Sequence, residues 1–220
     1  MRKPARLSLE ALSPYLLDTA CGLATNPEAA KPQAAVLNWR SLFANDHPVE
    51  IEIGAGKGLF LVTAGEAHPE TNYLGVEVIR ALQLYIATRV AKRKLTNVRV
   101  ACADARRLLH ERVAAASVHA VHVYFPDPWW KKRHHKRRVW TPEFAADCVR
   151  VLEPGGRLHV ATDVPEYFEH IRELLAAQPG LHLLRAEDQA GPPRPDEVLT
   201  NFERKARQKG GLVFRAEYEK

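Results

Sequence analysis

Residues 49–58 read VEIEIGAGKG, in which apolar and acidic side chains alternate over five residues and glycine then occupies every second position. Such alternation predicts a β-strand with one buried face. Glycines after a strand let the backbone turn tightly and approach a ligand closely, and a following helix offers free N–H groups. The stretch therefore predicts the strand, loop and helix that open an α/β fold, with a ligand at the carboxyl end of the strand.

On the C-terminal side of this unit, β-rich runs alternate with helical stretches. This order predicts a mostly parallel sheet wrapped by helices. No clear crossover helix precedes the last run, which is therefore expected to pair antiparallel at the edge of the sheet. The expected strands cover 49–53, 72–78, 97–103, 120–125, 156–162, 181–186 and 212–219, and the expected helices cover 80–94, 141–152 and 163–178.

The first 48 residues contain five prolines and one plausible helix, at 33–44. We interpret residues 1–48 as an N-terminal arm that covers one edge of the core, and residues 49–220 as the α/β domain. Cys21, Cys102 and Cys148 are odd in number and widely spaced, which favours a reducing compartment over a disulfide framework. No apolar run approaches the roughly 20 residues that span a bilayer. We expect a soluble, cytoplasmic protein.

Positive charge is concentrated in residues 125–138, which read FPDPWWKKRHHKRR. Six Lys and Arg against one Asp give this stretch a net charge of +5 (6 − 1), of a total of +6 for the chain. So local a field predicts a docked polyanion. The histidines in and near this stretch are not expected to bind metal. His119 and His122 lie three residues apart on a strand and so point to opposite faces.

Acidic residues lie at the ends of three expected strands, in step with the glycines. Glu77 follows the glycines by about twenty residues, the offset at which an acid accepts hydrogen bonds from ribose hydroxyls. Asp104 is expected to reach an adenine amino group. Glu52, beside Gly54 and Gly56, would repel a diphosphate but suits a cation. Together with GxGxG in place of the GxGxxG of dinucleotide sites, this favours S-adenosylmethionine over NAD. The alternative is three solvated acids.

Seven motifs together resemble the bacterial-type tRNA (guanine-N7)-methyltransferases over about residues 49–220. They are EIGAGKG, Glu77, Asp104, FPDPWWKKRHHKRR, LEPGG, ATD at 161–163 and TNFERK at 200–205. The resemblance implies a Rossmann-like class I methyltransferase with a mostly parallel seven-stranded sheet, helices on both faces and an antiparallel C-terminal edge strand. It also implies methyl transfer from S-adenosylmethionine to N7 of a guanine in the tRNA variable loop.

Matched position by position, the family pattern assigns roles to individual residues. The cofactor-site acids are Glu52, Glu77, Asp104 and Asp127, and the substrate-contact positions are Lys131, Asp163, Thr200, Asn201, Phe202 and Glu203. The sequence departs from many members in its N-terminal arm, where only Arg2, Lys3 and Arg6 replace an arginine-rich segment.

Guanine N7 presents a lone pair and has no proton to lose, so its methylation requires no general base. Alignment and electrostatics must supply the rate acceleration. We expect Asp127, fixed by its flanking prolines, to accept hydrogen bonds from the guanine edge and offset the developing positive charge. Trp129 or Trp130 is expected to stack on the base, with core packing as the alternative for one of them. The cations from Lys131 onward are expected to contact phosphates.

Two other functions stay open at this point. The first is methylation of an exocyclic amine, because an acid-proline-proline-aromatic motif serves that chemistry in the same place, although the order here is Pro126-Asp127-Pro128-Trp129. The second is a non-catalytic RNA-binding protein, against which the intact glycine loop and acids argue. The expected partner is tRNA, bound by a monomer or homodimer with no membrane, metal or obligatory accessory subunit.

Overall fold

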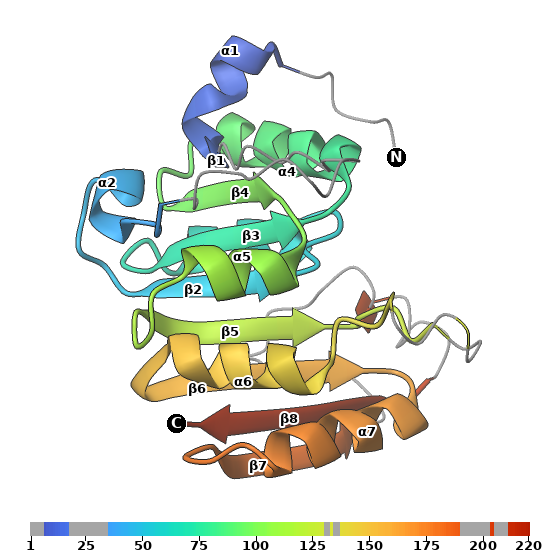
Figure 1. Cartoon of the computed structure of the whole chain (residues 1–220). Helices are drawn as coiled ribbons and strands as arrows, with labels where there is room; N and C mark the ends of the chain where they lie inside the picture. Colours follow the sequence, from blue (N-terminus) through green and yellow to red (C-terminus); the bar gives the residue numbers. More distant parts are fainter. Residues whose placement is uncertain (1–6, 18–34, 130–132, 134–136, 190–202, 205–210) are drawn as a thin grey trace.

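One sheet organises the computed structural model, which describes residues 7–17, 35–129, 133, 137–189, 203–204 and 211–220 (Figure 1). Within these residues the strands lie in the order β1-β4-β3-β2-β5-β6-β8-β7. Neighbours from β1 to β6 are parallel, and β8 is antiparallel to both of its neighbours. The bounds are β1 Leu16–Leu17, β2 Val49–Ile53, β3 Asn72–Glu77, β4 Val98–Cys102, β5 Val118–Tyr124, β6 Leu152–Thr162, β7 His182–Gln189 and β8 Val213–Glu219.

The predicted α/β class and the seven predicted strands are confirmed, with two differences in the sheet. The C-terminal strand β8 is antiparallel as expected, but its predicted edge position is wrong: it lies between β6 and β7. Helix α7 (Pro165–Ala176) carries the chain two strand positions beyond β6, and β8 fills the position between β6 and β7. The sheet also has an eighth strand, because Leu16 and Leu17 of the arm pair with Val100 and Ala101 of β4.

Helices cover both faces of the sheet. In Figure 1, α5 (Ala105–Arg112), α6 (Pro142–Val151) and α7 lie in front of it, and α4 (Arg80–Lys92) lies behind β3 and β4. Helix α3 (Leu59–Ala67) packs on the same face as α4, where Gly75 admits Leu61: a Cβ at Gly75 would lie 2.2 Å from Leu61 Cδ1. The expected starts at Arg80 and at Pro142, which Thr141 caps through its side chain, are confirmed.

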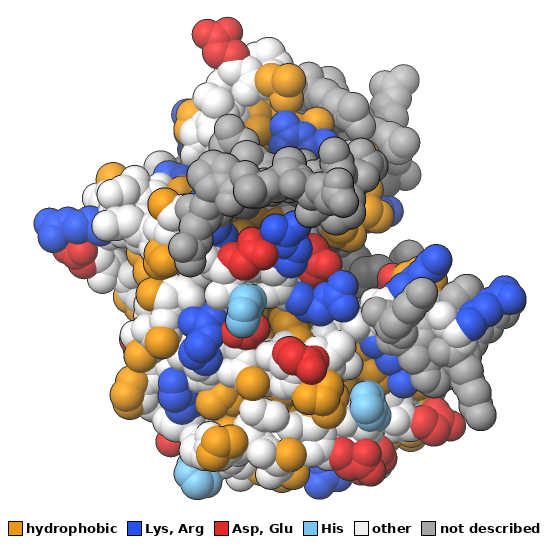
Figure 2. All heavy atoms as spheres, viewed as in Figure 1, with side chains coloured by type: hydrophobic (Ala, Val, Ile, Leu, Met, Phe, Trp, Pro, Cys, Tyr) orange, Lys and Arg blue, Asp and Glu red, His pale blue; other side chains and the backbone are white. Residues whose placement is uncertain are grey.

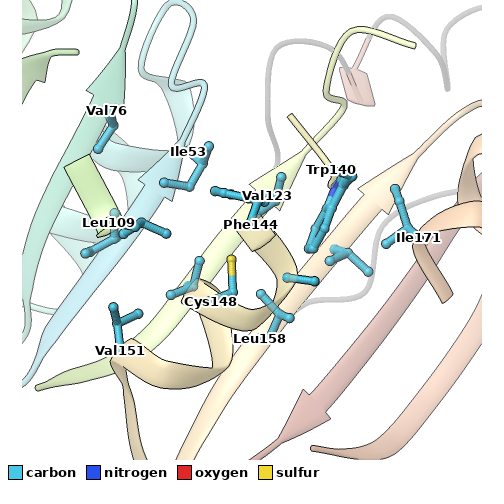
Figure 3. Close-up of a cluster of buried hydrophobic side chains, with 14 of the residues drawn as sticks. Ile53, Val76, Leu109, Val123, Trp140, Phe144, Cys148, Val151, Leu158 and Ile171 are labelled. Atoms are coloured by element: carbon cyan, nitrogen blue, oxygen red, sulfur yellow. The ribbon is translucent and has the colours of Figure 1, made fainter. Parts of the chain in front are cut away.

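The larger hydrophobic cluster fills the space between the sheet and α5, α6 and α7. Figure 3 shows its centre, where Phe144 and Cys148 of α6 face strand residues such as Val123 and Leu158. Trp140 is also buried here, with its ring edge-on to Phe144 at 5.3 Å between centroids. A second cluster lies under α3 and α4. These two clusters hold the parallel strands rigidly, so their carboxyl ends form a fixed platform.

Residues 7–17 of the N-terminal arm pack along the β4 edge of the sheet, whereas residues 35–39 contact Arg112 and Ser117. Helix α1 (Leu9–Leu12) contacts α4, and a 3₁₀ turn at Ser13–Tyr15 leads into β1. The helix expected at 33–44 is shorter than predicted: α2 spans Trp39–Phe43 and begins after Asn38, whose side chain accepts from the Ser41 N–H. Residues 33 and 34 lie outside the described part. Among the described residues, no helix has the length and hydrophobicity to cross a membrane.

Candidate active site

The predicted acids converge on one edge of the sheet. Strands β2 to β6 are parallel neighbours, so their carboxyl ends point the same way, toward the right in Figure 1. Glu77 ends β3, Asp104 follows β4 by two residues, and Asp127 and Asp163 follow β5 and β6. In open α/β sheets ligands bind outside the carboxyl ends of the strands, and the glycine loop lies at the same edge.

Glu77 holds the glycine loop in place. Its Oε2 accepts a hydrogen bond from the Gly56 N–H at 2.8 Å, and its Oε1 accepts one from the Ile79 N–H at 2.9 Å. Gly56 and Gly58 have positive φ of 55° and 63°, and a Cβ at Gly58 would lie 2.7 Å from Ile86 Cγ2, so the loop needs glycine at Gly58 on both counts. Each carboxylate oxygen keeps a lone pair for a ligand hydroxyl.

Glu52 is a buried acid with an unsatisfied oxygen. Its side chain is 4% exposed, and within the described chain its Oε2 has no hydrogen-bond partner. Burial raises the pKa of Glu52 well above its usual range, and the charge of Glu77 adds to the effect. A buried carboxylate without a partner is costly, and a cation beside it would offset that cost. The site is thus prepared for a positively charged group.

Asp104 caps helix α5. Its Oδ1 accepts from the Arg106 N–H at 2.9 Å, and its Oδ2 forms an ion pair with the Arg106 guanidinium at 3.0 Å. Although burial acts to raise the pKa of Asp104, the hydrogen bonds and charge of Arg106 outweigh it and hold that pKa low. The carboxylate is half-buried and ionised, so it can accept from a ligand amino group. Arg106 was not predicted as its partner.

The loop after β5 is held in a strained turn. Phe125 has a φ of 51°, unusual for a side chain of its size, and its N–H donates to the Ala161 carbonyl of β6 at 2.7 Å. Arg138 Nε donates to the Pro128 carbonyl at 2.7 Å, and its guanidinium lies 4.8 Å from the centre of the Tyr167 ring. Asp127 is exposed between these two fixed points, at the boundary where the sequence placed it.

Arg138 thus has partners within the protein, and its contact with phosphate stays a prediction. Its partners belong to residues 126–128 and to α7, and the spacing of cations along the sequence cannot reveal such partners. Arg133 and Arg137 are exposed, and Arg137 stacks over the Trp129 ring at 4.9 Å. Figure 2 shows Lys and Arg side chains at the same right-hand edge. Trp130, Lys131 and Lys136 lie outside the described residues.

The remaining predicted substrate positions fall in two places. Asp163 is exposed directly after β6. Glu203 is fully buried, with an exposed fraction of 0%, and its carboxylate pairs with the Arg215 guanidinium of β8. Thr200, Asn201 and Phe202 lie outside the described residues. The structure thus brings Glu52, Glu77, Asp104, Asp127 and Asp163 to one edge, and places Glu203 on the α3-side face of the sheet.

That face carries polar side chains which the sequence analysis missed. His122 Nε2 lies 2.8 Å from Glu50 Oε2, and His122 Nδ1 lies 2.9 Å from the Tyr124 hydroxyl. The His122 ring stacks on His159 with centroids 4.8 Å apart. These residues line a cavity of about 360 Å³ that reaches Arg215. The sequence signal that could have revealed this cavity was the presence of polar residues, such as His122, within strands that are otherwise apolar.

Comparison with known proteins settles the family. The family model described as "Putative methyltransferase" matches residues 46–216. The tRNA (guanine-N(7)-)-methyltransferase of Rhodopirellula baltica is 43% identical over 192 residues, which cover 84% of this chain and 71% of that protein. The chain belongs to the tRNA (guanine-N7)-methyltransferase family. A second tRNA (guanine-N(7)-)-methyltransferase, from Alkalilimnicola ehrlichii, is 41% identical over 93% of this chain and 84% of its own length.

Solved structures agree on the fold of this methyltransferase. The 16S rRNA methyltransferase KamB has a TM-score of 0.61 at 18% identity, with 82% of this chain and 92% of that chain covered. At this identity the similarity concerns the fold alone. The resemblance inferred from the motifs is therefore confirmed both in family and in architecture.

Family membership implies S-adenosylmethionine as the methyl donor, and the residues at the carboxyl edge fit it. The unsatisfied buried oxygen of Glu52 suits a cationic ligand, and the free lone pairs of Glu77 suit ribose hydroxyls. The half-buried carboxylate of Asp104 suits an amino group. Among the described residues, no cluster of three His, Cys, Asp or Glu side chains has the arrangement of a metal site.

Proposed function

We propose that this protein transfers the methyl group of S-adenosylmethionine to N7 of a guanine in the variable loop of tRNA. The observation that carries the proposal is the joint presence of the cofactor acids and Asp127 at one edge of the sheet, in a chain of this family. The carboxylates supply the cation, hydroxyl and amino-group contacts that this donor requires. The basic loop beside them supplies the contact with a polyanion.

In the proposed reaction the chain positions its two substrates and stabilises charge. The methyl donor brings an electrophilic methyl group, and guanine N7 attacks it without losing a proton. Glu52 and Glu77 orient the donor, and Asp127 accepts hydrogen bonds from the guanine edge while positive charge develops on the ring. Preorganised electrostatic contacts of this kind are worth about 10²–10³ in rate each. Asp163 is proposed as a further substrate contact across the same edge.

The direct test is to incubate the purified chain with labelled S-adenosylmethionine and unmodified tRNA and then to cleave with borohydride and aniline. We expect label in the tRNA and a cut at one guanine of the variable loop, because borohydride and aniline cleave the RNA chain at N7-methylguanosine. Label without a cut would instead indicate methylation of an exocyclic amine. Absence of label together with tRNA binding would indicate a non-catalytic RNA-binding protein.

The exposed cations of the loop give a second prediction. Arg133 and Arg137 are exposed and follow Asp127 in the sequence, so we propose that they contact phosphates. In the Arg133→Gln, Arg137→Gln double variant, the slope of log K for tRNA against log salt should become shallower by roughly 0.7–0.9 for each lost contact. The measurement is tRNA binding by fluorescence anisotropy between about 50 and 200 mM salt.

The matched control is Arg107→Gln, an exposed arginine on α5 whose guanidinium pairs with Glu111 at 3.0 Å. Its salt slope should equal that of the wild type. If the double variant also keeps the wild-type slope, the loop cations do not contact the RNA backbone. Arg138 is left unchanged because it holds the loop in place.

The same assay tests whether an accessory subunit is needed. We propose a monomer or homodimer that needs no accessory subunit, so the purified chain alone should methylate tRNA. A cytoplasmic location is proposed because tRNA is the substrate and because Cys102 and Cys148, both buried in the core, form no disulfide within the described residues. Cys21 lies outside the described residues.

A further inference from the structure

Tyr124 and Arg215 occupy one row of side chains across the sheet. Tyr124 of β5 is the register partner of Ala161 on β6, and Ala161 is the register partner of Arg215 on β8. The guanidinium of Arg215 lies 6.0 Å from the centre of the Tyr124 ring. The row lies at the carboxyl end of β5, and Phe125 starts the Asp127 loop immediately after it.

Arg215 also fixes Glu203. The Glu203 side chain is fully buried and that of Arg215 is 17% exposed, so both ends of their ion pair are largely removed from water. Burying two charges costs several kcal/mol, which their attraction offsets only when the geometry is good. In this pair Arg215 Nη2 donates to Glu203 Oε2. Apolar side chains in the same place would stabilise the fold equally well, so the main effect of such an ion pair is to fix the positions of its two side chains.

Tyr124 is itself rigidly held. Its hydroxyl lies 2.9 Å from His122 Nδ1, and His122 Nε2 lies 2.8 Å from Glu50 Oε2. A carboxylate only accepts, so His122 Nε2–H donates to Glu50 Oε2. The Tyr124 ring also packs against Phe60 of α3, with centroids 5.5 Å apart. The surface against which Arg215 rests is therefore immobile.

Three segments that carry the proposed function meet at this point. Phe60 belongs to the helix that follows the glycine loop, Tyr124 leads directly into the Asp127 loop, and Glu203 ends the segment 200–203 that the family pattern assigns to substrate contact. A fully buried, ion-paired carboxylate is poorly placed to bind RNA directly. Its pairing with Arg215 of β8 does, however, fix the C-terminal end of that segment near Tyr124, which leads into the Asp127 loop.

We infer that Arg215 is a positioning residue for the tRNA substrate, which it serves by anchoring Glu203 beside Tyr124. This inference rests on the proposed function, and it assigns to Glu203 an indirect role in place of direct substrate contact. It predicts that loss of the anchor impairs tRNA binding while S-adenosylmethionine still binds, because Glu52, Glu77 and Asp104 belong to β2, β3 and the start of α5.

The test compares Arg215→Met, Arg215→Lys, Glu203→Gln and the Arg215→Met, Glu203→Gln double variant with the wild type. Arg215→Met should raise KM for tRNA about tenfold or more and change Kd for S-adenosylmethionine less than about twofold, as expected when one partner of a buried charged pair is lost. The double variant should be no worse than Arg215→Met, because both substitutions break one interaction. Arg215→Lys should recover part of the loss.

The matched control is Arg157→Met, which removes another sheet arginine that pairs with glutamates of β8 but is 44% exposed. Its KM for tRNA should equal that of the wild type. If Arg215→Met lowers only the melting temperature, or weakens S-adenosylmethionine as much as tRNA, Arg215 has no positioning role. Where Arg215→Met does not fold, Arg215→Lys and Glu203→Gln decide by the same criteria.

Failure of the proposed function has a different signature. A wild-type protein that binds tRNA but leaves its guanines unmethylated contradicts the proposed function alone, and the Kd for tRNA then replaces KM in the comparison. An unchanged Kd for tRNA in Arg215→Met would still overturn the inference.

Discussion

Replacing Asp127 with alanine should lower kcat for tRNA methylation by about 10²–10³. The reason is that Asp127 is exposed at the carboxyl edge, while the backbone on either side of it is fixed by the Phe125 and Arg138 hydrogen bonds. A carboxylate so held is in place before the guanine arrives and pays little reorganisation cost as charge develops. Single-turnover methylation of unmodified tRNA at saturating S-adenosylmethionine measures the effect on the chemical step.

Two further variants define what Asp127 contributes. Asp127→Asn keeps the shape and one acceptor but removes the charge, so a loss close to that of alanine would assign most of the effect to charge. Asp46→Ala removes an exposed aspartate that precedes β2, at the opposite end of that strand, and should leave kcat unchanged. Calorimetry should show Kd for S-adenosylmethionine rising less than about tenfold in Asp127→Ala. Near-normal turnover in Asp127→Ala would remove it from the catalytic machinery.

The parallel strands and the acids at their ends could be predicted because their cause is local. Alternating side chains report which face of a strand is buried, and parallel strands bring their carboxyl ends to one edge wherever they lie in the sheet. Glu77 and Asp104 could therefore be assigned to the site without knowledge of the strand order. The preference for S-adenosylmethionine over NAD followed from the GxGxG spacing and from Glu52, whose charge would repel a diphosphate.

The missed features depend on partners that are distant in sequence. The two residues of β1 are too few to show a strand pattern. The interior position of β8 depends on where the chain rejoins the sheet after α7. Arg138 appeared to be one cation among several until its contacts with Pro128 and Tyr167 became visible. Glu203 was assigned to substrate contact by the family pattern, and its burial could not be predicted because it depends on Arg215, twelve residues further on.

Glu52 should couple cofactor binding to the release of a proton. Because burial, aided by the charge of Glu77, raises its pKa well above the usual range, a fraction of the free protein carries a proton on Glu52. A cationic donor binds the ionised form, so binding must expel that proton. Calorimetric titrations with S-adenosylmethionine in two buffers of different ionisation enthalpy should reveal the release, and affinity should weaken as the pH falls below the raised pKa.

Glu52→Gln should abolish proton release and weaken S-adenosylmethionine by about 10- to 150-fold, the range expected when a hydrogen bond to a charged group is lost. The sign of the stability effect follows from the same pKa. The folded pKa of Glu52 lies above its unfolded value, so wild-type stability should fall relative to Glu52→Gln as the pH rises from about 4.5 through the folded pKa, by at most roughly 1.4 kcal/mol per pH unit.

Glu50→Gln is the matched control, since Glu50 lies on the same strand two residues away and has the opposite shift. Although burial acts to raise its pKa, the hydrogen bond and charge of His122 hold it below the usual 4.5. Its stability contribution is therefore complete above pH 4.5 and is lost as the pH falls through the lowered pKa. Urea unfolding of both variants from pH 3 to 8 should show opposite slopes relative to the wild type, in adjacent pH windows. Equal slopes of stability against pH would contradict the raised pKa of Glu52. Proton release that persists in Glu52→Gln would mean that another group binds the cation of the donor.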